Sequence, residues 1–189
     1  YMHYLKERGL LQTHLDMYEG RKGLNFEAVT NLPEEAYCDN WIGGNALQFL
    51  DSFPEGRPWH MVVNFTGPHD PYDVTPAMRD AWKDVDIPPP VDHPDPGEAS
   101  IRIRRQNYAA MIENIDAWAG RLIEKVAARG ELENTLIVYA SDHGEMLGDH
   151  GRWQKSVWYT PSAGIPLIVA GPGVQEGVVS DALVSLHDL

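Results

Sequence analysis

Residues 136–145 read LIVYASDHGE. The first half is a short apolar run with β-branched and aromatic side chains, which is typical of a buried strand. The polar residues Ser141, Asp142 and His143 follow at once, and Gly144 allows the backbone to bend sharply beside them. The stretch therefore predicts a strand that ends in a polar turn.

Four segments outside this stretch also carry a regular pattern. Helical spacing of apolar residues predicts a helix from Asp39 to Phe53, capped by Asp39 or Asn40, and a longer helix from Tyr108 to about Gly130. Short apolar runs predict buried strands at residues 59–65 and 165–170. This alternation predicts an α/β fold with a largely parallel sheet flanked by helices.

A Pro-rich loop is predicted from about residue 67 to residue 100. It contains prolines at positions 76, 88, 89, 90, 94 and 96, which disfavour regular structure over much of its length. A loop this long inside a compact domain usually has a function of its own. We expect it to shape the entrance to a site.

The composition excludes some classes of partner. There are 15 basic and 28 acidic residues, which give a net charge of −13. Because this surface repels polyanions, we expect no nucleic-acid partner. No apolar run approaches the roughly 18–20 residues that span a bilayer, so we expect no membrane partner. Cys38 is the single cysteine, which favours the cytoplasm slightly and leaves the periplasm or secretion open.

The chain length of 189 residues is enough for one domain with its own core. Residues 1–8 form a polar helical pattern rather than a signal peptide, and residues 186–189 contain no Gly or Pro stop signal. We therefore expect residues 1–189 to form a single partial domain of a longer protein.

Five polar residues are candidates for chemistry. Asp142 and His143 could turn toward one cation, or the Asp could cap a helix in an ordinary polar turn. His69 follows a Gly-Pro pair at a strand end, where an imidazole could donate a proton to an ester oxygen or bond only to the backbone. Lys155 could bind a tetrahedral anion or stay solvated. His150 is expected to support the site structurally.

Residues 141–155, SDHGEMLGDHGRWQK, closely resemble the sulfatase family of the alkaline-phosphatase superfamily. Its members carry Ser-Asp-His/Asn-Gly, then Gly-Asp/Glu-His-Gly, then a lysine, and then a Val/Ile-Pro-Leu-Ile strand like residues 165–168. Residues 65–72, FTGPHDPY, resemble the other internal landmark of the family. The resemblance covers most of the chain from about Tyr37 onward and implies an alkaline-phosphatase-like α/β fold.

The resemblance implies a metal-dependent sulfuric ester hydrolase that acts on a small anionic sulfate ester. Asp142 and His143 match the family's metal ligands. Lys155 matches the lysine that binds the sulfate oxygens, and His69 matches the histidine near the leaving oxygen. The usual family ion is Ca²⁺, while a histidine ligand would also suit Mn²⁺ or Zn²⁺.

Parts of the family's active site have no match. The family nucleophile derives from Cys or Ser in a Cys/Ser-x-Pro/Ala-x-Arg motif, whereas Cys38 is followed by Asp-Asn-Trp-Ile. The acidic pair that completes the metal site is also absent. The resemblance therefore implies that this chain contains no nucleophile and, alone, is inactive and binds metal weakly.

Two other functions fit the same residues. Phosphonate monoester and phosphodiester hydrolases share the fold and the Asp-His pair, and their substrates are tetrahedral anions as well. A degenerate hydrolase-like domain would bind ligands or partners without turnover. The presence of His69, Asp142, His143 and Lys155 together argues against the degenerate domain.

Overall fold

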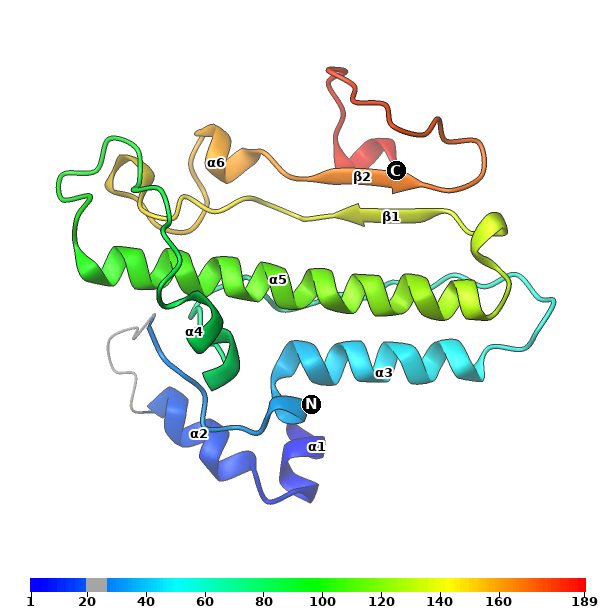
Figure 1. The fold of residues 1–189 in the computed structure, drawn as a ribbon, viewed down its shortest axis with the longest axis horizontal. Coiled ribbons are helices and arrows are strands. Elements are labelled where there is room, and N and C mark those ends of the chain that lie inside the picture. Colours follow the sequence, from blue (N-terminus) through cyan, green and yellow to red (C-terminus); the bar gives the residue numbers. More distant parts are fainter. Residues whose placement is uncertain (20–26) are drawn as a thin grey trace.

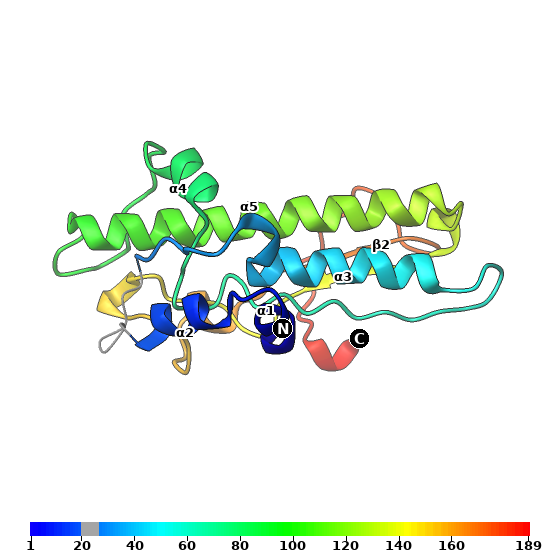
Figure 2. The same cartoon turned by 90° about the horizontal axis from the view of Figure 1, so that it is seen from below.

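The computed structural model describes residues 1–19 and 27–189 (Figure 1). The longest helix, α5 (Ala99–Ala128), runs along the middle of the molecule. Strands β1 (Ile137–Ala140) and β2 (Leu167–Ala170) lie on one side of it. Helices α3 (Cys38–Ser52) and α4 (Pro76–Trp82) lie on the other side. Figure 2, seen from below, shows α3 alongside the second half of α5.

The helix predicted from Tyr108 to about Gly130 is confirmed, but it begins earlier, at Ala99. The added turns are held by tertiary contacts rather than by the apolar stripe alone. The buried Asn107, for example, donates its amide to the carbonyl oxygen of Tyr72 over 2.8 Å. The helix ends at Ala128, and the expected stop residue Gly130 follows the C-cap with a φ of +71°, in the left-handed region that favours glycine.

Helix α3 confirms the helix predicted from Asp39 to Phe53, but the expected cap is wrong. The N-cap position is Tyr37, and no side chain caps the helix. Asp39 is buried in the first turn, where its carboxylate accepts hydrogen bonds from the backbone N–H groups of Thr66 and Gly67. The carboxylate is thus occupied by the loop that leads to His69.

The two strands differ from the sequence prediction in direction and burial. Strands β1 and β2 form where expected but pair antiparallel, with Ile137 opposite Ala170, and not as part of a largely parallel sheet. The reason is that residues 141–166 turn back at the end of β1 and do not cross the sheet with a long helix (Figure 1). Leu136 and Val138 are exposed, so the predicted burial of β1 is wrong.

The strand predicted at residues 59–65 does not form in the described part of the chain. These residues are extended, and their side chains alternate between half-buried and exposed. They make no backbone hydrogen bonds to the described strands, and a strand needs such a partner.

Helix α4 lies inside the loop where prolines were expected to prevent regular structure. Pro76 occupies the first turn, where its missing N–H costs no hydrogen bond, and Thr75 Oγ1 caps the helix by accepting from the N–H of Met78 over 3.3 Å. The indole N–H of Trp82 then binds Glu113 of α5 over 2.7 Å. One proline therefore starts a helix rather than excluding it.

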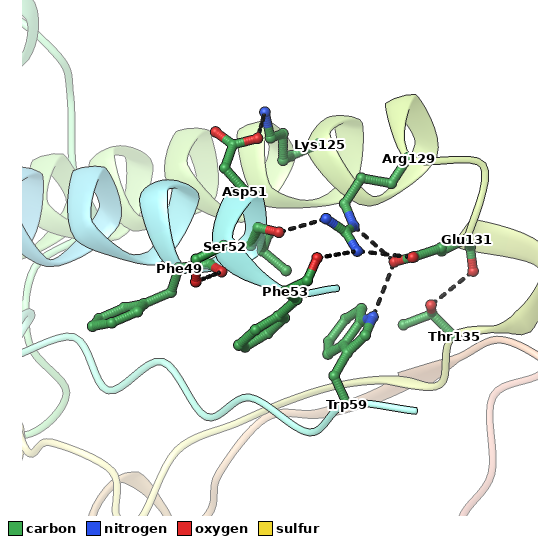
Figure 3. Close-up of polar contacts among 10 residues, drawn as sticks. Phe49, Asp51, Ser52, Phe53, Trp59, Lys125, Arg129, Glu131 and Thr135 are labelled. Atoms are coloured by element: carbon green, nitrogen blue, oxygen red, sulfur yellow. Dashed lines mark hydrogen bonds and ion pairs between the residues drawn. The ribbon is translucent and has the colours of Figure 1, made fainter. Parts of the chain in front are cut away.

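The end of α5 is fixed to the end of α3 by Arg129 (Figure 3). Its guanidinium donates to the carbonyl oxygen of Leu50 over 2.6 Å and to the carboxylate of Glu131 over 2.8 and 2.9 Å. The indole N–H of Trp59 binds the same carboxylate over 2.9 Å. This cluster, which we call the Arg129 clamp, ties three segments together at the end of the molecule where β1 begins.

The remaining elements are short. They are α1 (Met2–Glu7), α2 (Leu11–Glu19), α6 (Thr160–Ala163) and four single-turn 3₁₀ segments at Glu34–Ala36, Leu132–Asn134, Asp149–Gly151 and Leu186–Asp188. Among residues 1–19 and 27–189, no helix is both long and apolar enough to cross a membrane.

Candidate active site

The polar turn after β1 is fixed by a close approach to α6. The N–H of Gly144 donates to the carbonyl oxygen of Ser162 over 2.9 Å. A Cβ atom at position 144 would lie 2.0 Å from the carbonyl oxygen of Pro161. Glycine is therefore required here because there is no space for a side chain, and this contact holds the turn in place.

Asp142 and His143 bring one oxygen and one nitrogen donor close together at the turn. His143 Nδ1 lies 2.7 Å from the carbonyl oxygen of Gly144, an acceptor, so Nδ1 carries the proton and Nε2 has a free lone pair. Nε2 lies 3.8 Å from Asp142 Oδ2. Two electron-rich atoms facing each other at this distance suit a cation between them.

The pair is an incomplete metal site on its own. Within the part of the chain that the structure describes, no group of three or more His, Cys, Asp or Glu side chains could hold an ion. The Asp142 side chain is 84% exposed, so further ligands have access to it. An oxygen and a nitrogen donor fit a divalent cation, to which Asp142 and His143 would supply part of the coordination.

His69 and Lys155 meet beside this turn although they are 86 positions apart in the sequence. His69 Nε2 and Lys155 Nζ are 2.5 Å apart. Because two nitrogen lone pairs would repel, a contact this short requires a proton between them. The rings of His69 and His143 pack edge to face with centroids 6.0 Å apart. Four of the predicted site residues are thus brought together.

A cavity of about 980 Å³ opens beside these residues. Both the His69 loop and the turn from Ser141 to Glu145 line it. Cys38 also lines it, but burial raises the pKa of its thiol, so the reactive thiolate is disfavoured. This agrees with the mismatch between the residues around Cys38 and the nucleophile motif.

His150 contacts other residues than the two metal-ligand candidates. Its ring stacks on Tyr159 with centroids 4.4 Å apart, and its Nδ1 lies 3.3 Å from a carboxylate oxygen of Asp92. Its backbone N–H donates to the carbonyl oxygen of Val91 over 2.7 Å. His150 therefore connects the Pro-rich loop to the segment before Lys155.

Three residues that the sequence did not single out connect the site. Asp70 lies against the ring of His69, Gln154 precedes Lys155 and binds Asp70 over 3.1 Å, and Glu145 accepts the N–H of Gln154 over 2.5 Å. Asp70 could have been suspected from its place next to His69. No periodicity or spacing points to Gln154, because its partner is 84 positions away.

Two tyrosines lie close enough to Glu145 to be affected by its charge. Burial, together with the negative charge of Glu145, raises the pKa of Tyr72 above its ordinary range. The same causes, burial first, raise the pKa of Tyr108 to about 12. Both phenols therefore keep their protons at neutral pH and remain hydrogen-bond donors.

The sequence profile of the sulfatase family matches residues 5–189. This chain belongs to the sulfatase family. The prediction of family membership is thereby confirmed, and so is the α/β, alkaline-phosphatase-like fold class.

Two sulfatases and one hydrolase of similar fold show how much of the sequence and the fold is shared. The chain is 35% identical over 144 residues to the choline-sulfatase of Rhizobium meliloti (strain 1021), and the matched region covers 65% of this chain and 28% of that protein. It is 27% identical over 179 residues to an arylsulfatase of Clostridium perfringens (strain 13 / Type A), and the matched region covers 82% of this chain and 37% of that protein. Its fold is similar to that of the phosphonate monoester hydrolase SpPMH from Silicibacter pomeroyi, with a TM-score of 0.70, 24% identity and coverage of 80% and 36%. The chain thus spans 28–37% of the length of the two sulfatases.

Proposed function

We propose that the protein hydrolyses sulfate esters, with His69 and Lys155 on the sulfate group and Asp142 and His143 as two ligands of a divalent cation. The carrying observation is the 2.5 Å contact between Lys155 Nζ and His69 Nε2 beside the Asp-His turn. Membership of the sulfatase family supports the proposal, as do the names of the choline-sulfatase and arylsulfatase relatives.

The chemistry follows from the groups present. The Lys155 ammonium offsets negative charge on the sulfate oxygens. When the ester S–O bond breaks, its electron pair leaves with the ester oxygen, and the proton held between Lys155 Nζ and His69 Nε2 passes to this oxygen and converts it to a hydroxyl. The attacking nucleophile is proposed to come from outside residues 1–189, because Cys38 lacks both the motif and the thiolate character.

We propose Ca²⁺ as the cation, with Mn²⁺ and Zn²⁺ as the alternatives. A bound divalent cation would offset charge on the sulfate group. Asp142 offers oxygen atoms, which Ca²⁺ prefers, and His143 offers a nitrogen, which also suits Mn²⁺ and Zn²⁺. Elemental analysis of the purified full-length protein, followed by chelation and readdition of each ion, distinguishes the three.

The first experiment measures hydrolysis of 4-nitrophenyl sulfate by the full-length protein. Lys155→Ala should lower kcat/KM by about 10²–10³-fold, the usual cost of removing one charge-stabilising donor. Asp142→Ala should abolish turnover. The controls are Lys125→Ala and Asp84→Ala, since Lys125 pairs with Asp51 away from the site and Asp84 is exposed. Near-normal rates for both site variants would overturn the assignment, and the absence of turnover in the unaltered protein would support a degenerate domain.

A phosphonate monoester or phosphodiester hydrolase is the second candidate. The fold similarity to SpPMH supports this candidate, and the Asp142-His143 pair is compatible with it. Rates on 4-nitrophenyl sulfate and on a 4-nitrophenyl phosphonate monoester, measured side by side, decide between the two. A higher kcat/KM on the phosphonate would replace the sulfatase assignment.

A further inference from the structure

Gln154 is held by its backbone on both sides. Its N–H donates to the carboxylate of Glu145 over 2.5 Å, and its carbonyl oxygen accepts from the N–H of Met146 over 3.0 Å. The same Glu145 oxygen accepts the N–H of Leu147 over 3.2 Å. The segment that carries Lys155 is therefore folded back and tied to the metal-ligand turn through Glu145.

The backbone of Gln154 lies in a region that glycine would occupy at lower cost. Its φ is +66°, and a non-glycine residue is strained there. The side chain nevertheless makes a specific contact, since its amide Nε2 donates to Asp70 Oδ2 over 3.1 Å. Glycine, whose side chain is a hydrogen atom, would relieve this strain. A glutamine at this position therefore indicates that its side-chain amide has a specific role.

Asp70 connects Gln154 to His69. Its side chain is only 12% exposed, and its second oxygen, Oδ1, lies 2.9 Å from His69 Nδ1. The carbonyl oxygen of Asp70 lies at the same distance from Nδ1. Because Nδ1 faces two acceptors, it carries a proton, and Nε2 is the ring atom left to face Lys155.

We propose that Gln154 is a positioning residue: by holding Asp70, it fixes the His69 ring so that Nε2 faces Lys155 Nζ, where the proton for the leaving oxygen of the ester is held. This inference rests on the proposed function of the Lys155–His69 pair as the proton donor to that oxygen. Gln154 touches no reacting atom, and its effect passes through Asp70 and His69. Its loss should matter most when the leaving oxygen is a strong base that needs the proton.

The test uses leaving-group dependence in the full-length protein. Gln154→Gly removes the amide and relieves the positive φ, so folding is preserved. It should lower kcat/KM about tenfold for an alkyl sulfate, a poor leaving group, and less than about twofold for 4-nitrophenyl sulfate, since misplacing a proton donor costs rate only where the proton is needed. Ser156→Gly is the matched control: Ser156 has a φ of +74° on the other side of Lys155 and no role in holding Asp70.

A double-mutant cycle separates positioning from a general structural effect. In a His69→Ala background, Gln154→Gly should produce no further loss on the alkyl sulfate, because its effect passes through His69. Equal losses on both esters, no loss on either, or additive losses in the double variant would overturn the proposal. If the unaltered protein hydrolyses neither sulfate nor phosphonate esters, the proposed function itself fails and this inference falls with it.

Discussion

Asp39 is the residue through which the core of α3 holds the His69 loop. Its carboxylate is 1% exposed and accepts the N–H of Thr66 over 2.8 Å, the hydroxyl of Thr66 over 2.9 Å and the N–H of Gly67 over 3.1 Å. It lies in the first turn of α3, where the helix dipole favours negative charge. Asp39→Asn keeps the shape of the side chain but removes the charge and turns one acceptor oxygen into a donor.

The magnitude follows from the donors around it. One Asn oxygen can keep the two bonds from Thr66 and the 3.2 Å bond from the N–H of Gly67, which leaves the new amide nitrogen buried beside that N–H, donor against donor and without an acceptor. A buried donor without a partner costs about 1–3 kcal/mol, and the remaining bonds lose their charge assistance. We therefore expect the free energy of unfolding to fall by about 2–4 kcal/mol.

The assay is urea unfolding followed by circular dichroism, with Asp51→Asn as the control. Asp51 lies on the same helix, but its side chain is 62% exposed and pairs with Lys125, a surface ion pair worth about 0–1 kcal/mol. The Asp39 variant should also lose sulfate ester hydrolysis, because Thr66 and Gly67 lead directly to His69. If Asp39→Asn is as mild as Asp51→Asn, the carboxylate does not hold the loop and the reasoning is wrong.

Two further predictions concern the frame around the site. Gly43→Ala should lower the free energy of unfolding by about 1–3 kcal/mol, because its Cβ would lie 2.2 Å from the Trp118 ring. Gly44→Ala, whose Cβ would have nothing within 4 Å, should raise the free energy of unfolding by about 0.5–1 kcal/mol. Urea unfolding of these two isomeric variants compares them. In the Arg129 clamp (Figure 3), the hydrogen bond from Arg129 lowers the pKa of Glu131. The contribution of this carboxylate to the free energy of unfolding is therefore complete above the ordinary glutamate pKa of about 4.3 and is lost as pH falls through the lowered value. The free energy of unfolding of Glu131→Gln, measured from pH 7 to pH 3, should lack this part of the acid dependence.

Local patterns in the sequence predicted the elements that depend on local forces. The apolar stripe from Tyr108 onward needs only helical spacing, and the strand at residues 136–140 needs only a short β-branched run. The segment at residues 59–65 also has an apolar, β-branched centre but makes no backbone pairing in the described part of the chain. Pairing and direction depend on which segments meet, and a local pattern does not contain that information.

The site shows the same division. Asp142 and His143 could be suspected from their place after a strand, whereas the meeting of His69 with Lys155 came from resemblance to the sulfatase family. Neither the local pattern nor the family resemblance identified Gln154. Its contact to Asp70 depends on a left-handed backbone conformation that no propensity favours for glutamine.

The Pro-rich loop was expected to shape the entrance to the site, and its contacts point to a second role. The N–H of Val91 donates to an Asp149 oxygen over 2.9 Å, while the N–H of His150 donates to the carbonyl oxygen of Val91 over 2.7 Å. Leu147 and His150 both have positive φ values, +48° and +55°, which are strained for these residues.

Such strain persists only where the surroundings fix the backbone from several directions. Arg105 of α5 donates to the carbonyl oxygen of Leu147 over 2.8 Å, and the loop holds Asp149 and His150 from the other side. Residues 147–156 are thus held between the long helix and the loop. We infer that the Pro-rich loop stabilises the strained backbone of residues 147–156, which places Lys155 beside His69. Shortening the loop should therefore weaken sulfate binding even where access to the cavity is unchanged.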